Sequence, residues 1–353
     1  MTLKIENNSD SVLTFVQMSR THSLTTEHLT VGYRTNRQDH AVAKALQLTV
    51  PVGQLICLLG PNGSGKSTLL RTLAGMQPPL AGDIQLLGHP LATLTASQRA
   101  TQLAIVLTEP PYANLTVYDL VAMGRYPYTG SLGRLSEDDQ RTIVEAMEVT
   151  RVQHFADRRV GTLSDGERQK VMIARAVAQD TPLLILDEPT AHLDVPNRTA
   201  ILRLLQQLAH QHQRAVLLST HALDLALQMA DRLWLLHQGT IRTGVPEDLV
   251  LDGTLASVFA HEHENITFDL HAGMFRVTPS GGRTIGLSGP MPGVFWVRRA
   301  LERVGYTVTD PSPGISSVCV SESSAPLRWT IKQASRSVDG QGIEALLQEL
   351  SVN

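Results

Sequence analysis

A glycine-rich segment, GPNGSGKST, has the residue types and spacing that bind the phosphates of a nucleotide. Its glycines let backbone N–H groups turn inward toward a phosphate, and Lys66 brings a positive charge to the β- and γ-phosphates. The hydroxyl of Ser67 is a ligand for Mg²⁺, and Thr68 is placed to contact the α-phosphate. The candidate phosphate-binding residues are Gly60, Pro61, Asn62, Gly63, Ser64, Gly65, Lys66, Ser67 and Thr68.

Two carboxylates and a histidine follow apolar runs elsewhere in the chain. In the segment LLILDEP, Asp187 and Glu188 directly follow the apolar run LLIL, and His221 is the last residue of the run STH. We expect Asp187 to hold Mg²⁺ and Glu188 to act as the general base that polarises an attacking water. His221 is placed to contact a γ-phosphate. With Lys66, these residues predict hydrolysis of a nucleoside triphosphate.

The elements that must position these residues are short apolar strands. LICLL precedes Gly60, LLIL precedes Asp187, and AVLLS precedes the threonine next to His221. Continuous apolar strands are typical of a sheet covered by helices on both faces, in which ligands bind beyond the carboxyl ends of the strands. Helical patterns alternate with these runs, so the sequence predicts an α/β fold with a mostly parallel core sheet.

Composition narrows the class of protein. The 353 residues are 42% hydrophobic and 18% charged, and the net charge of -3 gives no reason to expect a nucleic-acid partner. No apolar stretch approaches the ~20 residues that span a bilayer, and the start MTLKIENNSD lacks a secretion signal, so we expect a cytoplasmic location. Cys57 and Cys319 have no metal-ligand spacing and are interpreted as reduced thiols.

We expect three parts along the chain. Residues 1–22 are polar and weakly patterned, which is typical of a flexible N-terminal extension. Residues 23–260 form the phosphate-binding domain, with a helical subdomain inserted at about 113–182. Residues 261–353 form a small α+β domain, whose role as a regulator or as a dimer support stays open.

The segment LSDGERQK (Leu163 to Lys170) resembles the signature LSGGQ-[RK]-Q-[RK] of ATP-binding cassette (ABC) ATPases. The motif order is also similar to that of the family: phosphate loop, helical insert, signature, LLILDEP, the AHLD turn and STH. The resemblance covers roughly residues 24–250. It implies an ABC-type fold, ATP as the nucleotide, and two copies paired head to tail, with each ATP between one copy's phosphate loop and the other's signature.

The resemblance also implies further site residues. Ser164 and the backbone of Gly166 would contact the γ-phosphate in the partner copy's site, and Asp194 would signal between the two sites. Tyr33, about 30 residues ahead of Lys66, matches the aromatic residue that stacks on adenine. A tyrosine in a VGY turn is equally suited to packing.

The segment from Asn114 to Asp139, with the element GRYP, resembles the helical subdomain of ATPases that serve importers of ferric siderophores, haem and cobalamin. This implies a polytopic membrane permease as partner, a peripheral location on the inner face of the plasma membrane, and an indirect link to a periplasmic or surface solute-binding protein. Five residues would either line a groove for the permease or fill the subdomain core: Leu120, Val121, Met123, Tyr126 and Tyr128.

Three positions depart from the family pattern, each toward an acidic residue. Glu109 stands where the family usually carries a glutamine that touches Mg²⁺ and the attacking water; in the signature, Asp165 replaces a glycine and Glu167 a glutamine. Because a carboxylate is a hard oxygen ligand, Glu109 is a further candidate for Mg²⁺, with Ser67 and Asp187. Either these acids point to water, or they make isolated ATPase activity low and unusually Mg²⁺-dependent.

Other questions stay open at this point. A non-transport ABC ATPase, or a regulatory nucleotide-binding module with weak hydrolysis, is the alternative function, although Lys66, Glu188 and His221 argue against lost hydrolysis. His261 and His263 would chelate a metal ion if they lay on one face of a strand, or belong to a solvated loop. The identity of the transported substrate depends on the partner proteins.

Overall fold

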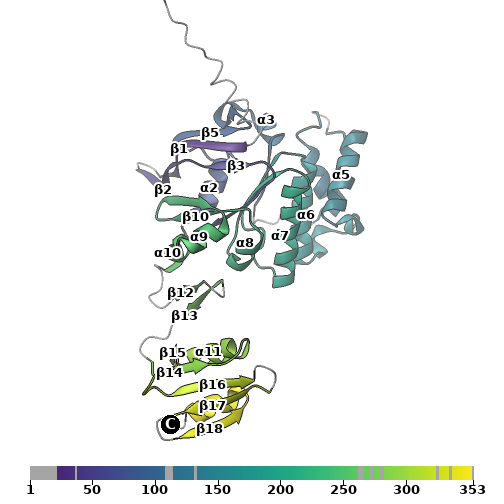
Figure 1. Ribbon diagram of the computed structural model, residues 1–353. Helices are drawn as coiled ribbons and strands as arrows, with labels where there is room; N and C mark the ends of the chain where they lie inside the picture. Colours follow the sequence, from purple (N-terminus) through teal and green to yellow (C-terminus); the bar gives the residue numbers. More distant parts are fainter. Residues whose placement is uncertain are drawn as a thin grey trace, which may run out of the picture. The chain divides into compact units, whose positions relative to one another are not determined.

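A computed structural model describes residues 22–35, 38–107, 114–130, 133–260, 266–270, 273–277, 282–322, 326–333 and 336–351 (Figure 1). They belong to two compact units, Met1–Phe259 and Ala260–Asn353, which are described separately. Three expectations fall outside the described residues: the extension 1–22 apart from His22, the Mg²⁺ candidate Glu109, and the histidines His261 and His263.

The core of the first unit is a six-stranded sheet in the order β11-β10-β4-β9-β8-β7. All neighbours are parallel except β10 and β11, which form an antiparallel hairpin. The predicted α/β fold with a mostly parallel sheet is confirmed. The strands are β4 (Leu55–Leu59), β7 (Leu103–Val106), β8 (Leu183–Leu186), β9 (Ala215–Ser219), β10 (Arg232–His237) and β11 (Thr240–Gly244).

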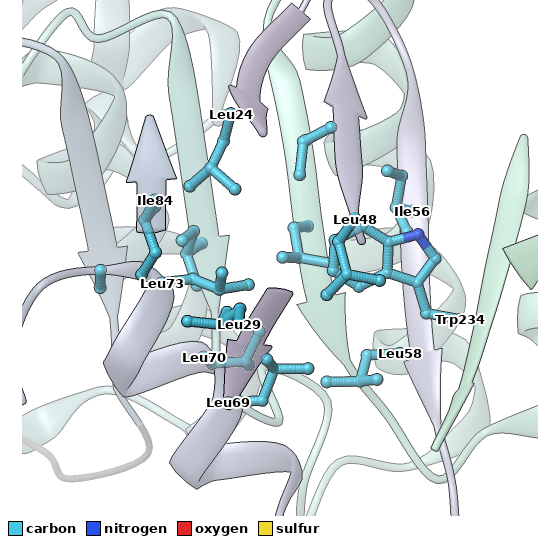
Figure 2. Packing of buried hydrophobic residues seen from close by; sticks show 14 of the residues in the cluster. Leu24, Leu29, Leu48, Ile56, Leu58, Leu69, Leu70, Leu73, Ile84 and Trp234 are labelled. Carbon is cyan, nitrogen blue, oxygen red and sulfur yellow. The ribbon is translucent and has the colours of Figure 1, made fainter. Parts of the chain in front are cut away.

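A second, antiparallel sheet packs on the core, and the sequence pattern had not indicated it. Its long first strand pairs with β2, β3 and β5, but the register shifts at Leu29, Val31 and Gly32, so no long run of strict alternation marks it. Figure 2 shows Leu24 and Ile84 of this sheet within the core cluster. Its strands are β1 (His22–Thr35), β2 (Gln38–Leu46), β3 (Thr49–Pro51), β5 (Ala81–Leu86) and β6 (His89–Pro90).

The helices of the first unit include the predicted helical insert, in which α5 and α6 lie side by side (Figure 1). A buried ion pair ties this insert together: Arg125 Nε lies 2.8 Å from Asp139 Oδ1, and Arg125 Nη1 donates to the carbonyl of Ala178 at 2.9 Å. The helices are α2 (Lys66–Leu73), α3 (Ala96–Ala100), α4 (Val117–Ala122), α5 (Glu137–Val149), α6 (Asp165–Ala178), α7 (Val195–His210), α8 (Leu223–Met229), α9 (Pro246–Leu251) and α10 (Thr254–Ala260).

The second unit is an α+β fold. Its five-stranded sheet has the order β15-β14-β16-β17-β18, and Val297 and Leu301 of α11 are fully buried against it together with Trp329. The small α+β domain expected at the C-terminal end of the sequence is confirmed. The elements are β12 (Ile266–Asp269), β13 (Met274–Val277), β14 (Thr284–Ser288), α11 (Gly293–Arg303), β15 (Thr307–Thr309), β16 (Ser317–Glu322), β17 (Arg328–Lys332), β18 (Ser337–Gln341) and α12 (Ile343–Ser351).

Within the described ranges, none of the helices combines the length and the apolar character that a bilayer-spanning segment needs.

Candidate nucleotide-hydrolysis site

The phosphate loop joins buried strand β4 to helix α2, which begins at Lys66. Gly65 has φ of 98°, and a Cβ there would lie 1.9 Å from Cγ1 of Val42, so only glycine fits this position. The Lys66 side chain is 6% exposed and folds back over the loop, where Nζ donates to the carbonyl oxygens of Gly60 at 2.9 Å and Pro61 at 3.0 Å. The loop therefore brings a positive charge to the start of a helix, where the helix dipole also favours an anion.

Asp187 follows β8 and lies directly against this loop. Its Oδ1 accepts a hydrogen bond from Ser67 Oγ at 3.1 Å and another from Ser219 Oγ at 2.7 Å. The Asp187 side chain is buried, and its backbone N–H donates to the carbonyl of Val106 at 2.9 Å. The carboxyl ends of β8 and β9 and the start of α2 thus place two hydroxyls within hydrogen-bond reach of one carboxylate oxygen.

Glu188 is held in an uncommon backbone conformation beside Asp187. Its φ of 50° lies in the left-handed region, which costs a residue other than glycine about 1 to 3 kcal/mol. The backbone N–H of Glu188 donates to Ser219 Oγ at 2.8 Å, which holds this conformation. The carboxylate of Glu188 is half-exposed, and its Oε1 lies 2.9 Å from Nε2 of His221. The Glu188 carboxylate and the His221 imidazole are therefore both partly exposed, beyond the carboxyl ends of β8 and β9.

These groups fit a magnesium nucleotide in their chemistry. Mg²⁺ prefers hard oxygen ligands, and the structure brings a carboxylate (Asp187) and a hydroxyl (Ser67) to 3.1 Å from each other. The hydroxyl of Ser64, in the phosphate loop, is buried without a hydrogen-bond partner among the described residues, as expected of a group whose partner is a phosphate oxygen.

Tyr33 lies on β1 and is 53% exposed, so it is not a core residue. Its ring stacks on that of His40, its partner across the β1–β2 hairpin, with centroids 5.3 Å apart. Two residues further along β2, Val42 packs on Gly65 of the phosphate loop. The hairpin therefore holds an exposed aromatic ring on β1, next to β2, the strand that touches the loop.

The described contacts of Ser164 and Gly166 are with helices α6 and α7, not with the residues around the phosphate loop. Ser164 caps α6, and within the described residues its hydrogen bonds join it to its own helix only. Gly166 approaches α7 so closely that a Cβ would lie 2.8 Å from Cγ of Asn197, whose backbone N–H donates to Oδ1 of Asp194 at 3.0 Å. The signature thus packs against the first turn of α7, which is capped by Asp194, the last residue of the AHLD turn.

Sequence reasoning missed Ser219, although its hydroxyl bonds both the carboxylate of Asp187 and the backbone N–H of Glu188. It is the last residue of β9 and fully buried, donates to Asp187 and accepts from Glu188. The available signal was its position: a hydroxyl residue ends an apolar strand just before the threonine that precedes His221.

Among the subdomain candidates, Tyr126 and Tyr128 are exposed, whereas Leu120 and Val121 are completely buried.

Fold and site together define an ABC-type ATPase. The ABC transporter family model matches residues 43–191, and the model of the iron ABC transporter C-terminal domain matches residues 282–351.

Individual relatives agree with the family models. An uncharacterised ABC transporter ATP-binding protein of Methanocaldococcus jannaschii is 39% identical over 229 residues, which cover 64% of this chain and 78% of the relative. The iron(3+)-hydroxamate import ATP-binding protein FhuC of Bacillus subtilis is 36% identical over 248 residues, 70% of this chain and 91% of that protein. A solved structure described as an inward-facing metal-chelate type ABC transporter aligns with a TM-score of 0.58 at 28% identity, over 67% of this chain and 89% of that one.

The chain belongs to the family of ABC transporter ATP-binding proteins. The predicted resemblance, the ABC-type fold and the prediction of a transport ATPase that binds ATP are confirmed.

Proposed function

We propose that this ATPase powers import of a metal chelate of the ferric siderophore, haem or cobalamin class. The observation that carries the proposal is the pairing, in one chain, of an ABC transporter match with an iron ABC transporter C-terminal domain match. The names of relatives support it, among them the iron(3+)-hydroxamate import protein already described and the ferric enterobactin transport ATP-binding protein FepC of Escherichia coli, 37% identical over 228 residues.

Within the ATP site, we propose a role for each residue. Lys66 and the backbone N–H groups of the loop Gly60–Thr68 bind the phosphates, and Tyr33 stacks on adenine. Ser67 and Asp187 would hold Mg²⁺, which when bound neutralises charge on the phosphates. Glu188 takes a proton from the attacking water, and His221, whose Nε2 lies 2.9 Å from that carboxylate, contacts the γ-phosphate.

The site is complete only with a second copy of the chain. Ser164 and Gly166 open α6 and their described hydrogen bonds and contacts are local or to α7, so neither contributes to the phosphate loop of its own chain. In a head-to-tail homodimer these residues reach the γ-phosphate bound by the partner copy. ATP binding then closes the dimer, and hydrolysis reopens it.

The remaining proposals concern partners and organisation. Tyr126 and Tyr128, 58% and 41% exposed, offer an aromatic surface on the helical subdomain for a membrane permease. Through the permease the ATPase would lie on the inner face of the membrane and depend indirectly on a solute-binding protein. We assign residues 23–260 to the ATPase domain and 261–353 to an accessory domain.

Reconstitution tests the proposal. The chain is purified with a permease that binds it, placed in liposomes, and assayed for ATP-dependent uptake of a ferric hydroxamate, haemin and cyanocobalamin. We expect uptake of one of them, abolished by Glu188→Gln. If ATP is hydrolysed normally but none of the three chelates accumulates or changes the rate, the substrate class is wrong.

A further inference from the structure

The signature serine is engaged by a carboxylate of its own chain. Glu167 Oε2 accepts hydrogen bonds from both the backbone N–H and the hydroxyl of Ser164, each at 2.8 Å, and the N–H of Glu167 donates back to Ser164 Oγ at 3.4 Å. This reciprocal arrangement is a capping box at the start of α6. The hydroxyl proton of Ser164 is thereby directed at Glu167, not at a ligand.

The charge of Glu167 persists at neutral pH. Hydrogen bonds from the backbone and then the hydroxyl of Ser164 hold the pKa of this carboxyl below its ordinary value, with smaller contributions from the positive charges of Arg158 and His154. The neighbouring Asp165 differs, because it forms an ion pair with Arg168 on the same helix. Within the described residues, Glu167 forms no such ion pair, so its charge is the less compensated one at the signature.

A second capping box in the same chain shows that the cap does not need this charge. At the start of α3, Gln98 Oε1 accepts from the backbone N–H of Thr95 at 2.9 Å and from its hydroxyl at 3.1 Å, and Gln98 N–H donates to Thr95 Oγ1 at 3.2 Å. Glutamine therefore makes the same three bonds as Glu167. What the carboxylate adds at the signature is a negative charge beside Ser164.

We propose that Glu167 is a positioning residue that restrains ATP-driven pairing: it holds the Ser164 hydroxyl on its own chain and opposes the approach of the partner's γ-phosphate. This inference rests on the proposed composite site, in which Ser164 contacts the nucleotide of the second copy. Closure must turn the hydroxyl of Ser164 away from Glu167 and bring two negative groups together. The restraint keeps unliganded and weakly liganded copies apart.

The test compares Glu167→Gln with a matched control, Gln98→Glu, in the full-length chain. Gln98→Glu makes the reverse charge change at the exposed capping box of α3. Both are placed in a Glu188→Gln background, so that ATP is bound but not turned over. Light scattering then gives the ATP concentration for half-maximal dimer formation, with Mg²⁺, at several salt concentrations.

We expect Glu167→Gln to lower that concentration roughly threefold to tenfold at low salt, with a difference that shrinks as salt screens the charge. Gln98→Glu should leave it unchanged. Titrations of Glu167→Gln that overlay the parent at every salt concentration would overturn the proposal. Ser164→Ala tests the composite site separately. If this variant forms dimers with the same ATP dependence as the parent, the composite site itself is wrong.

Discussion

Removal of the Ser219 hydroxyl tests how the catalytic carboxylate is held. In Ser219→Ala, the backbone N–H of Glu188 loses the acceptor that lies 2.8 Å away, and Asp187 loses a donor at 2.7 Å. A buried N–H without a partner costs about 1 to 3 kcal/mol, which is as large as the strain of the left-handed backbone at Glu188. Relaxation of that residue would move the base away from the attacking water.

The expected result is a fall in kcat of about tenfold to a hundredfold, since each 1.4 kcal/mol is worth a factor of ten. KM should change little, because Lys66 and the phosphate loop are untouched. Steady-state ATPase assays and thermal unfolding of the purified variant provide the measurement. Unfolding should occur a few degrees lower, at roughly 2 to 4 °C for each kcal/mol in a unit of this size.

Ser23 provides a matched control. Its hydroxyl is also fully buried but has no hydrogen-bond partner among the described residues, so Ser23→Ala leaves no group unpaired. We expect it to retain kcat and to unfold at the same temperature or higher. The reasoning about Glu188 is refuted if Ser219→Ala keeps kcat within about twofold of the parent while unfolding at a lower temperature.

Three further outcomes follow from the same structure. Glu188→Gln should reduce single-turnover ATP hydrolysis about a hundredfold or more while nucleotide binding, measured by fluorescence titration, persists. Asp139→Asn removes one partner of the buried ion pair with Arg125 and should lower the free energy of unfolding by about 3 kcal/mol. Hydrogen bonds from Ser136 and then Arg125 lower the pKa of Asp139 in the folded protein. The stability that the Asp139 carboxylate contributes to the parent should therefore be lost as the pH falls below 3.8. Burial raises the pKa of the Cys57 thiol to about 12, so alkylation at pH 8 followed by mass spectrometry should leave Cys57 unmodified in the folded protein.

The core of the site follows from local sequence because its motifs are contiguous. Strand β4, the phosphate loop and α2 form one stretch, and Asp187 directly follows the apolar strand β8. In a parallel sheet the carboxyl ends of neighbouring strands meet at one edge, so the meeting of Ser67 with Asp187 was predictable in principle.

Features built from long-range pairing were harder to predict. Ser219 bonds residues that lie 31 and 32 positions earlier in the chain, and its place at the end of an apolar strand does not by itself identify these partners. The antiparallel sheet around β1 is interrupted by register shifts, which break the alternation that marks a strand. The spacing S-x-x-E is typical of a capping box, so the bond between Ser164 and Glu167 was predictable from the sequence. The resemblance to the signature predicted only ligand contacts for Ser164.

The most direct test of the central claim, an ATP site shared between two copies, mixes two inactive variants. Lys66→Ala lacks the phosphate-binding lysine and Ser164→Ala lacks the signature hydroxyl, so each alone should hydrolyse ATP very slowly. In a mixed dimer, however, the Lys66 of one copy meets the Ser164 of the other and rebuilds one intact site. The account predicts that mixing restores hydrolysis well above the level of either variant; activity equal to their average would contradict it.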